Sequence, residues 1–163
     1  MADCDLTSWQ IAQHKHDCRN HADIHSLHKT ERLKHYGLHF AKYVGRIARS
    51  SSEPKPVERT LVDCMLVCLS AANTLHQNLG TIAVSGNANS NDKFFKLADA
   101  TGRFADACEK IDHLEDFVGQ ARTANSDIAH LLVSWAGEIS LNLSEEMGRR
   151  RMELAARQFY IRD

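Results

Sequence analysis

Two aspartates lie near the start of the two most apolar stretches of the chain, and they are the first candidates for chemistry. Asp63 lies in RTLVDCMLVCLSAANTLHQNL, residues 59–79, and Asp127 lies in RTANSDIAHLLVSWAGEISLNL, residues 122–143. Continuous apolarity over several turns predicts a helix that is buried on most faces. A carboxylate on such a helix has to pair with a cation, bind a metal ion or turn outward.

The two stretches share a plan, which predicts an internal duplication. Each begins with Arg-Thr, continues with an Asp and an apolar run, and ends in Asn-Leu, with the Asp and the final Leu equally far apart in both. The helices expected before them also align, AKYVGRIAR against ADATGRFAD, which places Gly45-Arg46 opposite Gly102-Arg103. A glycine inside a helix costs about 1 kcal/mol relative to alanine, so two at matching positions predict close approach of neighbouring helices. Chance similarity between two alanine-rich helices is the alternative.

The composition predicts an all-α protein with one core. The chain has 163 residues, enough for a buried core without disulfides or metals. Aromatic residues are 7% of the chain and only two prolines occur, a balance that favours helices over strands. We expect a helical bundle divided into a histidine-rich N-terminal segment (1–28), a first helix pair (29–80), a linker (81–93) and a second helix pair with a C-terminal helix (94–163). The expected anchors of the N-terminal segment are Leu6, Trp9 and Ile11. Gly80 is expected to cap the second helix, and the C-terminal helix to run from a Ser144 cap to about Tyr160.

The overall charge and the cysteines limit the partners and the compartment. The formal net charge of −1 gives no global field that would attract nucleic acid, so general nucleic-acid binding is disfavoured. The five cysteines are spread through helical patterns rather than arranged as a disulfide framework, which predicts reduced thiols. No apolar segment approaches the roughly 20 residues that a membrane-spanning helix needs. We expect a cytoplasmic protein without membrane contact.

From Lys29 onward, the two helix pairs resemble the all-α NTP pyrophosphatase superfamily, the MazG-like and dimeric dUTPase-like proteins. In that family a first helix carries an ExxE motif, and a second helix carries ExxD before an apolar run. The four acids bind Mg²⁺, which bridges the phosphates of a nucleoside triphosphate while water attacks and pyrophosphate leaves. Carboxylates three positions apart lie on one helix face, so facing helices can supply the oxygen ligands that Mg²⁺ prefers.

The resemblance carries one acid of the four into each half. VERTLVDCML places Asp63 on the last acid of ExxD, and TANSDIAH places Asp127 on the same position in the second half. The two acids of ExxE fall on Tyr43 and Arg46 in the first half, and on an alanine and an arginine in the second. Neither half therefore has the standard four-acid Mg²⁺ site.

Nearby acids are candidates for a displaced metal site. Asp99 and Asp106 lie on one helix face, and Asp127 is expected on the neighbouring helix, so these three could hold Mg²⁺ or Mn²⁺, with Asp63 as the candidate ligand of the first half. A solvated or ion-paired helix face is the alternative.

Basic residues are candidates for phosphate binding. Lys42 and Arg46 lie on the helix face near Asp63 and could receive phosphate directly. In the C-terminal helix, Arg150 and Arg157 share a face, and a guanidinium is well shaped to hold phosphate oxygens. Ion pairing, and the favourable placement of cations at a helix C-terminus, are the alternatives.

Most of the ten histidines lie between His14 and His39. His21, His25 and His28 would share one face if that segment is helical, and their spacing can bind Zn²⁺, Ni²⁺ or Fe²⁺. Imidazoles on a polar helix need no ligand, which is the alternative.

The sequence leaves two functions open. The resemblance implies a divergent relative of nucleotide pyrophosphohydrolases that binds a nucleoside triphosphate or phosphate ligand, with Mg²⁺ or Mn²⁺ as cofactor if it hydrolyses. Retention of Asp63 and Asp127 at matching positions favours this function. The loss of ExxE in both halves favours the alternative, a non-catalytic helical module that serves a protein partner or a homo-oligomer.

Overall fold

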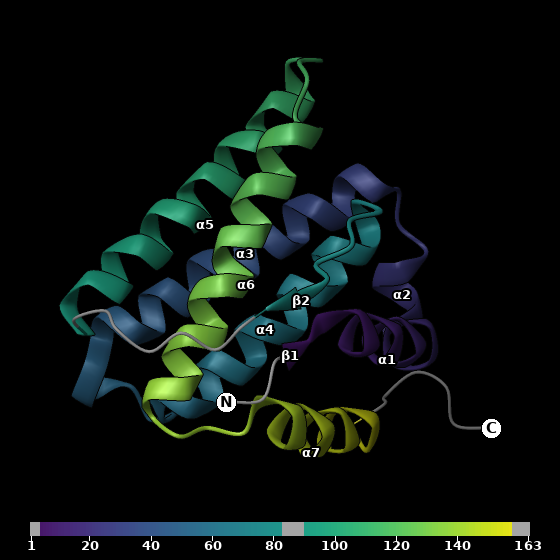
Figure 1. The fold of residues 1–163 in the computed structure, drawn as a ribbon. Helices are drawn as coiled ribbons and strands as arrows, with labels where there is room; N and C mark the ends of the chain where they lie inside the picture. Colours follow the sequence, from purple (N-terminus) through teal and green to yellow (C-terminus); the bar gives the residue numbers. More distant parts are fainter. Residues whose placement is uncertain (1–3, 83–89, 158–163) are drawn as a thin grey trace.

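The computed structural model describes residues 4–82 and 90–157, and helices dominate both ranges (Figure 1). The elements in chain order are β1 (Cys4–Asp5), α1 (Leu6–Asn20), α2 (Ala22–His25), α3 (Lys29–Arg49), the 3₁₀ helix η1 (Ser50–Ser52), α4 (Val57–Thr74), β2 (Thr81–Ile82), α5 (Ser90–Asp112), α6 (Val118–Glu138) and α7 (Leu143–Ala155). The predicted all-α class is confirmed.

Four long helices form the central bundle. α3 packs against α4 and α5, and α6 packs against the same two helices. The rings of Phe40 on α3 and Phe104 on α5 are fully buried and meet edge to face, with centroids 5.0 Å apart. The two expected helix pairs are thus α3–α4 and α5–α6, and their origin in a duplication stays a prediction.

The N-terminal segment and the last helix form a layer over α4. α1 packs against α4 and α7, and α7 also packs against α4 (Figure 1). Leu6 is fully buried and Trp9 is partly buried, as expected of anchors. Ile11, the third expected anchor, is 55% exposed, so that prediction is wrong. The inward face of α1 follows Leu6, Gln10 and Gln13, and helical geometry turns Ile11 outward.

The two buried helices α4 and α6 end in the same way. The Gln77 amide donates to the Ala72 carbonyl at 2.9 Å, and the Leu141 amide donates to the Ala136 carbonyl at 2.8 Å. The residue before each donor has a left-handed backbone, with φ of 49° and 56°. Both ends therefore follow the Schellman pattern, in which a left-handed residue lets the chain satisfy the last helical carbonyls.

Two helix boundaries differ from those expected. Gly80, expected as the left-handed cap of the second helix, lies in the loop beyond α4, because His76 supplies the left-handed residue. Asn142, rather than Ser144, caps α7, since its side chain accepts a hydrogen bond from the Glu145 amide.

The expected linker and the expected last helix also differ from the structure. α5 already begins at Ser90, inside the linker assigned to residues 81–93. α7 ends at Ala155, and the expected end near Tyr160 lies outside the described residues.

The close helix approach expected at the two aligned glycines does not occur. A methyl group added at Gly102 would meet nothing within 4 Å, and one added at Gly45 would meet only Arg49 of the same helix. α3 approaches α5 closely about two turns before Gly45, at Gly37, where an added methyl group would contact Cys108 and Phe104 of α5.

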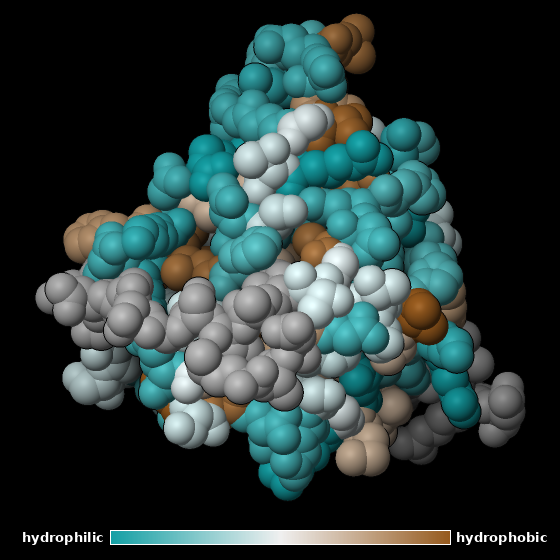
Figure 2. Space-filling view, viewed as in Figure 1, coloured by the Kyte–Doolittle hydropathy of each residue, from teal (hydrophilic) through white to brown (hydrophobic). Residues whose placement is uncertain are grey.

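Within the described ranges, no helix is both long and apolar enough to cross a lipid bilayer. Large apolar side chains that are exposed there lie on different elements, such as Leu38 on α3, Phe95 on α5 and Met152 on α7. Figure 2 shows a mainly hydrophilic face with small, separate hydrophobic areas.

A buried amide joins the two helix pairs. Asn125 on α6 is 0% exposed, and its Nδ2 group donates to the Cys68 carbonyl of α4 and to Gln77 Oε1, each at 3.1 Å. The Cys68 thiol donates in return to the Asn125 carbonyl at 3.4 Å. On the same side, the Arg122 guanidinium donates to the Leu75 carbonyl at the end of α4.

Replacing Asn125 with alanine should lower the free energy of unfolding by about 1 to 2 kcal/mol, because two buried hydrogen bonds between the helix pairs are lost. Urea denaturation followed by circular dichroism measures the change. The matched control is Thr123→Ala on the exposed face of α6, which should change stability by less than about 0.5 kcal/mol. Equal stability of the Asn125 variant and the native chain would contradict the assigned role.

Candidate functional site

The Asp63 carboxylate is buried among three guanidinium groups. Its side chain is 9% exposed. Arg150 of α7 donates through Nε to Oδ1 at 2.7 Å, and Arg46 of α3 donates through Nη1 to Oδ2 at 3.3 Å. Arg59, one turn earlier on α4, places Nε 3.7 Å from Oδ1. Asp63 is therefore paired with cations, which come from α3, α4 and α7.

The second helix pair contains the equivalent ion pair at the surface. Arg103 of α5 donates to Asp127 of α6 at 2.8 Å and to Asp99 of its own helix at 3.0 Å. The Asp127 side chain is 50% exposed. Asp106, one turn further along α5, accepts from the Gln120 side chain instead.

The four acids considered as metal ligands do not fit a Mg²⁺ site. Asp99 and Asp127 face the same guanidinium, so a positive side chain occupies the position between them. Asp106 has another partner, and Asp63 belongs to the other helix pair. A Mg²⁺ ion would have to displace an arginine at either place.

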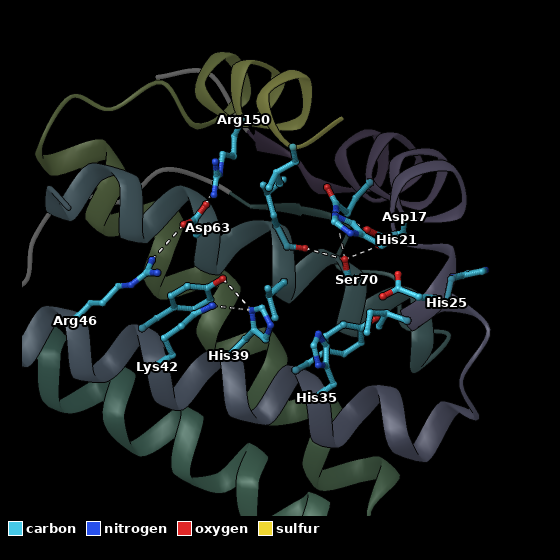
Figure 3. Close-up of a pocket in the computed structure, with 18 residues that line it drawn as sticks. Asp17, His21, His25, His35, His39, Lys42, Arg46, Asp63, Ser70 and Arg150 are labelled. Atoms are coloured by element: carbon cyan, nitrogen blue, oxygen red, sulfur yellow. Dashed lines mark hydrogen bonds and ion pairs between the residues drawn. The ribbon is translucent and has the colours of Figure 1, made fainter. Parts of the chain in front are cut away.

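A cavity of about 430 Å³ begins beside Asp63 (Figure 3). α3 forms one wall, α1, α2 and α7 form the other, and α4 lies behind it. Its volume falls within the roughly 300–1,000 Å³ that is usual for small-molecule sites. Apolar side chains from three helices, including Ile24, Leu66 and Leu154, line it together with polar groups at both ends.

The end of the cavity beside Asp63 has an excess of positive charge; we call it the cationic end, formed by Lys42, Arg46 and Arg150. Lys42 Nζ lies 3.1 Å from His39 Nδ1 and 4.7 Å from the centre of the Tyr43 ring. In the described part of the chain Lys42 makes no ion pair. Arg46, Arg59 and Arg150 share Asp63, and both Arg59 and Arg150 also pair with Glu153. These three guanidinium groups and Lys42 therefore meet only two carboxylates.

The pKa values at the cationic end reflect this imbalance. Partial burial, followed by the like charges of Arg46 and other cations, lowers the pKa of Lys42. Burial also lowers the pKa of His39 to about 4, so this imidazole is neutral at pH 7. Burial raises the pKa of Tyr43, which stays a neutral phenol. An anion in the cavity would oppose the first two shifts, since it would stabilise the charged forms of Lys42 and His39.

The opposite end of the cavity contains a buried carboxylate; we call it the acidic end, formed by Gln13, Asp17 and Ser70. Ser70 Oγ donates to Asp17 Oδ2 at 2.6 Å, and Gln13 Nε2 donates to Oδ1 at 2.9 Å. Burial raises the pKa of Asp17, and the Ser70 hydrogen bond partly offsets it. His21 and His25 lie near Asp17 at this end, and His35 faces the cavity from α3 (Figure 3).

The structure brings together only part of what the sequence indicated. Lys42, Arg46 and Arg150, three of the four predicted phosphate ligands, line one cavity with Asp63. Arg157, the fourth, is exposed beyond the end of α7 and does not line it. The acidic end was missed, because the glutamine and serine that hold Asp17 come from α1 and α4 and form no local motif.

The histidine segment is not one continuous helix. α1 ends at Asn20, α2 spans Ala22–His25, and α3 begins at Lys29. The single face expected for His21, His25 and His28 therefore does not form. His21 and His25 line the cavity, whereas His28 caps α3 by accepting a hydrogen bond from the Thr30 amide.

Comparisons with known protein families, with curated proteins and with solved structures found no match to this chain. The resemblance to the MazG-like proteins is neither supported nor contradicted by them and stays a prediction. The cavity and its charged side chains are the features of this protein that indicate a function.

Replacing Asp63 with asparagine should lower the free energy of unfolding by about 3 kcal/mol at low salt, because buried guanidinium groups lose their counter-charge. Urea denaturation measures the loss, and added inorganic phosphate should recover part of it. Asp127→Asn, the same change at the exposed equivalent position, should cost less than about 1 kcal/mol. Equal losses in the two variants would contradict the special role of Asp63.

The stability of the protein should fall as the pH drops from about 6.5 towards 4. An unfolded histidine titrates near 6.5, whereas folded His39 titrates at about 4, so acid favours the unfolded chain. His39→Gln should reduce the loss between pH 7.5 and 5 by on the order of 1 kcal/mol, allowing for the part of the ring open to solvent. Urea midpoints at the two pH values measure this. An unchanged pH dependence, matching that of the exposed control His130→Gln, would contradict it.

Proposed function

We propose that this protein binds a nucleoside phosphate in the cavity, with the phosphates at the cationic end. Its main support is the convergence of Lys42, Arg46 and Arg150 from two helices on one end of a cavity, where these cations and Arg59 outnumber the carboxylates of Asp63 and Glu153. Guanidinium and ammonium groups are the side chains that recognise phosphate oxygens. A phosphate there would supply the counter-charge that Lys42 lacks.

The rest of the cavity suits the remainder of such a ligand. The rings of His35 and His39 lie on the α3 wall with centroids 4.5 Å apart and planes tilted by 53°, so an imidazole face can pack against a base. At the acidic end, the Asp17 carboxylate is a hydrogen-bond acceptor for a sugar hydroxyl or an exocyclic amine. Anion recognition at one end and donor recognition at the other would orient the ligand along the cavity.

The proposal is for binding without metal-dependent hydrolysis. A divergent origin from the MazG-like pyrophosphohydrolases accounts for two helix pairs that each retain an Asp at the ExxD position. Arg46 and Arg103 stand at the position of the second acid of the family's ExxE motif. Both donate hydrogen bonds to those aspartates. Protein cations would therefore do the phosphate neutralisation that Mg²⁺ does in the family.

A regulatory role for the bound state combines the two functions left open by the sequence. Binding without turnover is the behaviour of a sensor or an assembly module, whose output is a protein partner or a second copy of the chain. Nucleoside triphosphates and reduced thiols belong to the cytoplasm, and the proposal places the protein there.

The test is a titration of the purified chain with ATP, dUTP and inorganic triphosphate, in EDTA and again with Mg²⁺. A ligand that binds only the folded state raises the unfolding midpoint, and calorimetry gives its Kd. Binding should persist in EDTA and weaken with added salt, because the contacts are charged side chains. No midpoint shift with any of these compounds at millimolar concentration would overturn the proposal.

Lys42→Gln should weaken binding about tenfold or more, because one charge-assisted contact to phosphate is lost. Lys29→Gln removes the same charge from the same helix, away from the cavity, and should leave the Kd unchanged. Equal weakening in both variants would indicate attraction by overall charge rather than a site. Release of pyrophosphate that requires Mg²⁺ would instead favour the enzyme of the resembled family.

A further inference from the structure

We propose that His14, Cys18 and His25 form a Zn²⁺ site with one open coordination position. His14 and Cys18 lie one turn apart on α1, and His25 ends α2, which folds back beside them. One donor atom from each residue lies within 4.8 Å of the other two. The site is separate from the cationic end, and the inference does not depend on the proposed nucleotide binding.

Both sulfur–nitrogen distances already match zinc coordination. Cys18 Sγ lies 3.6 Å from His14 Nε2 and 3.5 Å from His25 Nε2. In a tetrahedral site with Zn–S of about 2.3 Å and Zn–N of about 2.0 Å, a sulfur and a nitrogen ligand lie about 3.5 Å apart. An ion can therefore enter between the three donors with small side-chain movements.

The chemistry of the donors selects the metal. A thiolate with two imidazoles is a soft to borderline set, which favours Zn²⁺ over Mg²⁺ or Ca²⁺. His14 and Cys18 are exposed and His25 is half-buried, so the metal can reach them from solvent. This combination of residues differs from the single-face set of His21, His25 and His28 considered from the sequence, because the chain turns between α1 and α2.

A second cavity, of about 230 Å³, borders the proposed site. His14 and His25 both line it, and so do Asp17 and His76. Three protein ligands with space for water at the fourth position are typical of reactive rather than purely structural zinc sites. The structure thus leaves room for a water or a small anion on the metal.

Arg32 is the group that opposes this site. Its Nη1 atom lies 3.4 Å from His25 Nδ1. Zinc at Nε2 requires the proton on Nδ1, where it would face the N–H groups of the guanidinium. The Arg32 side chain therefore has to turn away on binding. A glutamine at this position could accept a hydrogen bond from the Nδ1–H group through its amide oxygen, as outer-shell partners of zinc histidines do.

The experiment is a Co²⁺ titration of the full, reduced chain, followed by displacement with Zn²⁺. One Co²⁺ per chain should give the d–d spectrum of a tetrahedral site and a thiolate-to-cobalt charge-transfer band, both lost when Zn²⁺ is added. Cys18→Ser should abolish the band and lower the affinity for Zn²⁺ by at least about 100-fold. Loss of an outer-shell partner alone can cost that much, and Cys18 is a direct ligand. Circular dichroism checks that the variant is folded.

Matched variants separate the site from general metal binding. His14→Ala and His25→Ala should each lower the affinity for Zn²⁺ at least tenfold. Cys4→Ser and His130→Gln should bind Zn²⁺ as tightly as the native chain does. Arg32→Gln should bind Zn²⁺ several-fold more tightly. No charge-transfer band, a band that survives in Cys18→Ser, or equal weakening by His130→Gln would overturn the proposal.

Discussion

The burial of the Asp63 carboxylate is the constraint on which the site depends. A charge that is 9% exposed requires compensation by nearby cations, and here the compensation comes from α3, α4 and α7. Arg150 thereby fixes α7 across the N-terminal half of α4, and Arg46 fixes the C-terminal half of α3 beside it. The cavity is the space left between these helices. Its cationic end exists because the cations gathered around Asp63 and Glu153 carry more positive charge than these two carboxylates neutralise.

The polar groups of the cavity oppose stability in the unliganded protein. Burial raises the pKa of Asp17 and lowers the pKa values of Lys42 and His39, so each charged form is disfavoured where it stands. The bundle offsets this elsewhere, through the apolar contacts of α3 to α6 and the Asn125 hydrogen bonds between α4 and α6. A local cluster of unfavourably buried polar groups, within a core that is otherwise well packed, is the pattern expected of a functional site.

Local signals in the sequence predicted the helices well and their contacts only in part. Helical periodicity and low aromatic content were enough for the all-α class, and apolarity around Asp63 was enough to require a partner. Arg46 could be anticipated because it lies on the helix preceding Asp63, at a position given by the alignment of the halves. Gly80 and Ser144 misled, since His76 took the left-handed position that favours glycine, and Asn142, as good a cap as serine, lay two residues earlier.

The groups that escaped prediction are those whose geometry depends on turns between helices. Asp17 meets Ser70 only because α1 lies on α4, and His25 meets Cys18 only because the chain reverses after Asn20. By contrast, the Arg46–Asp63 and Arg103–Asp127 pairs repeat one contact between a first and a second helix. α7 covers the first pair and leaves the second in solvent, so the same interaction borders a cavity in one half and is a surface ion pair in the other. The difference between the halves thus lies in the helices added around them rather than in the pairs themselves.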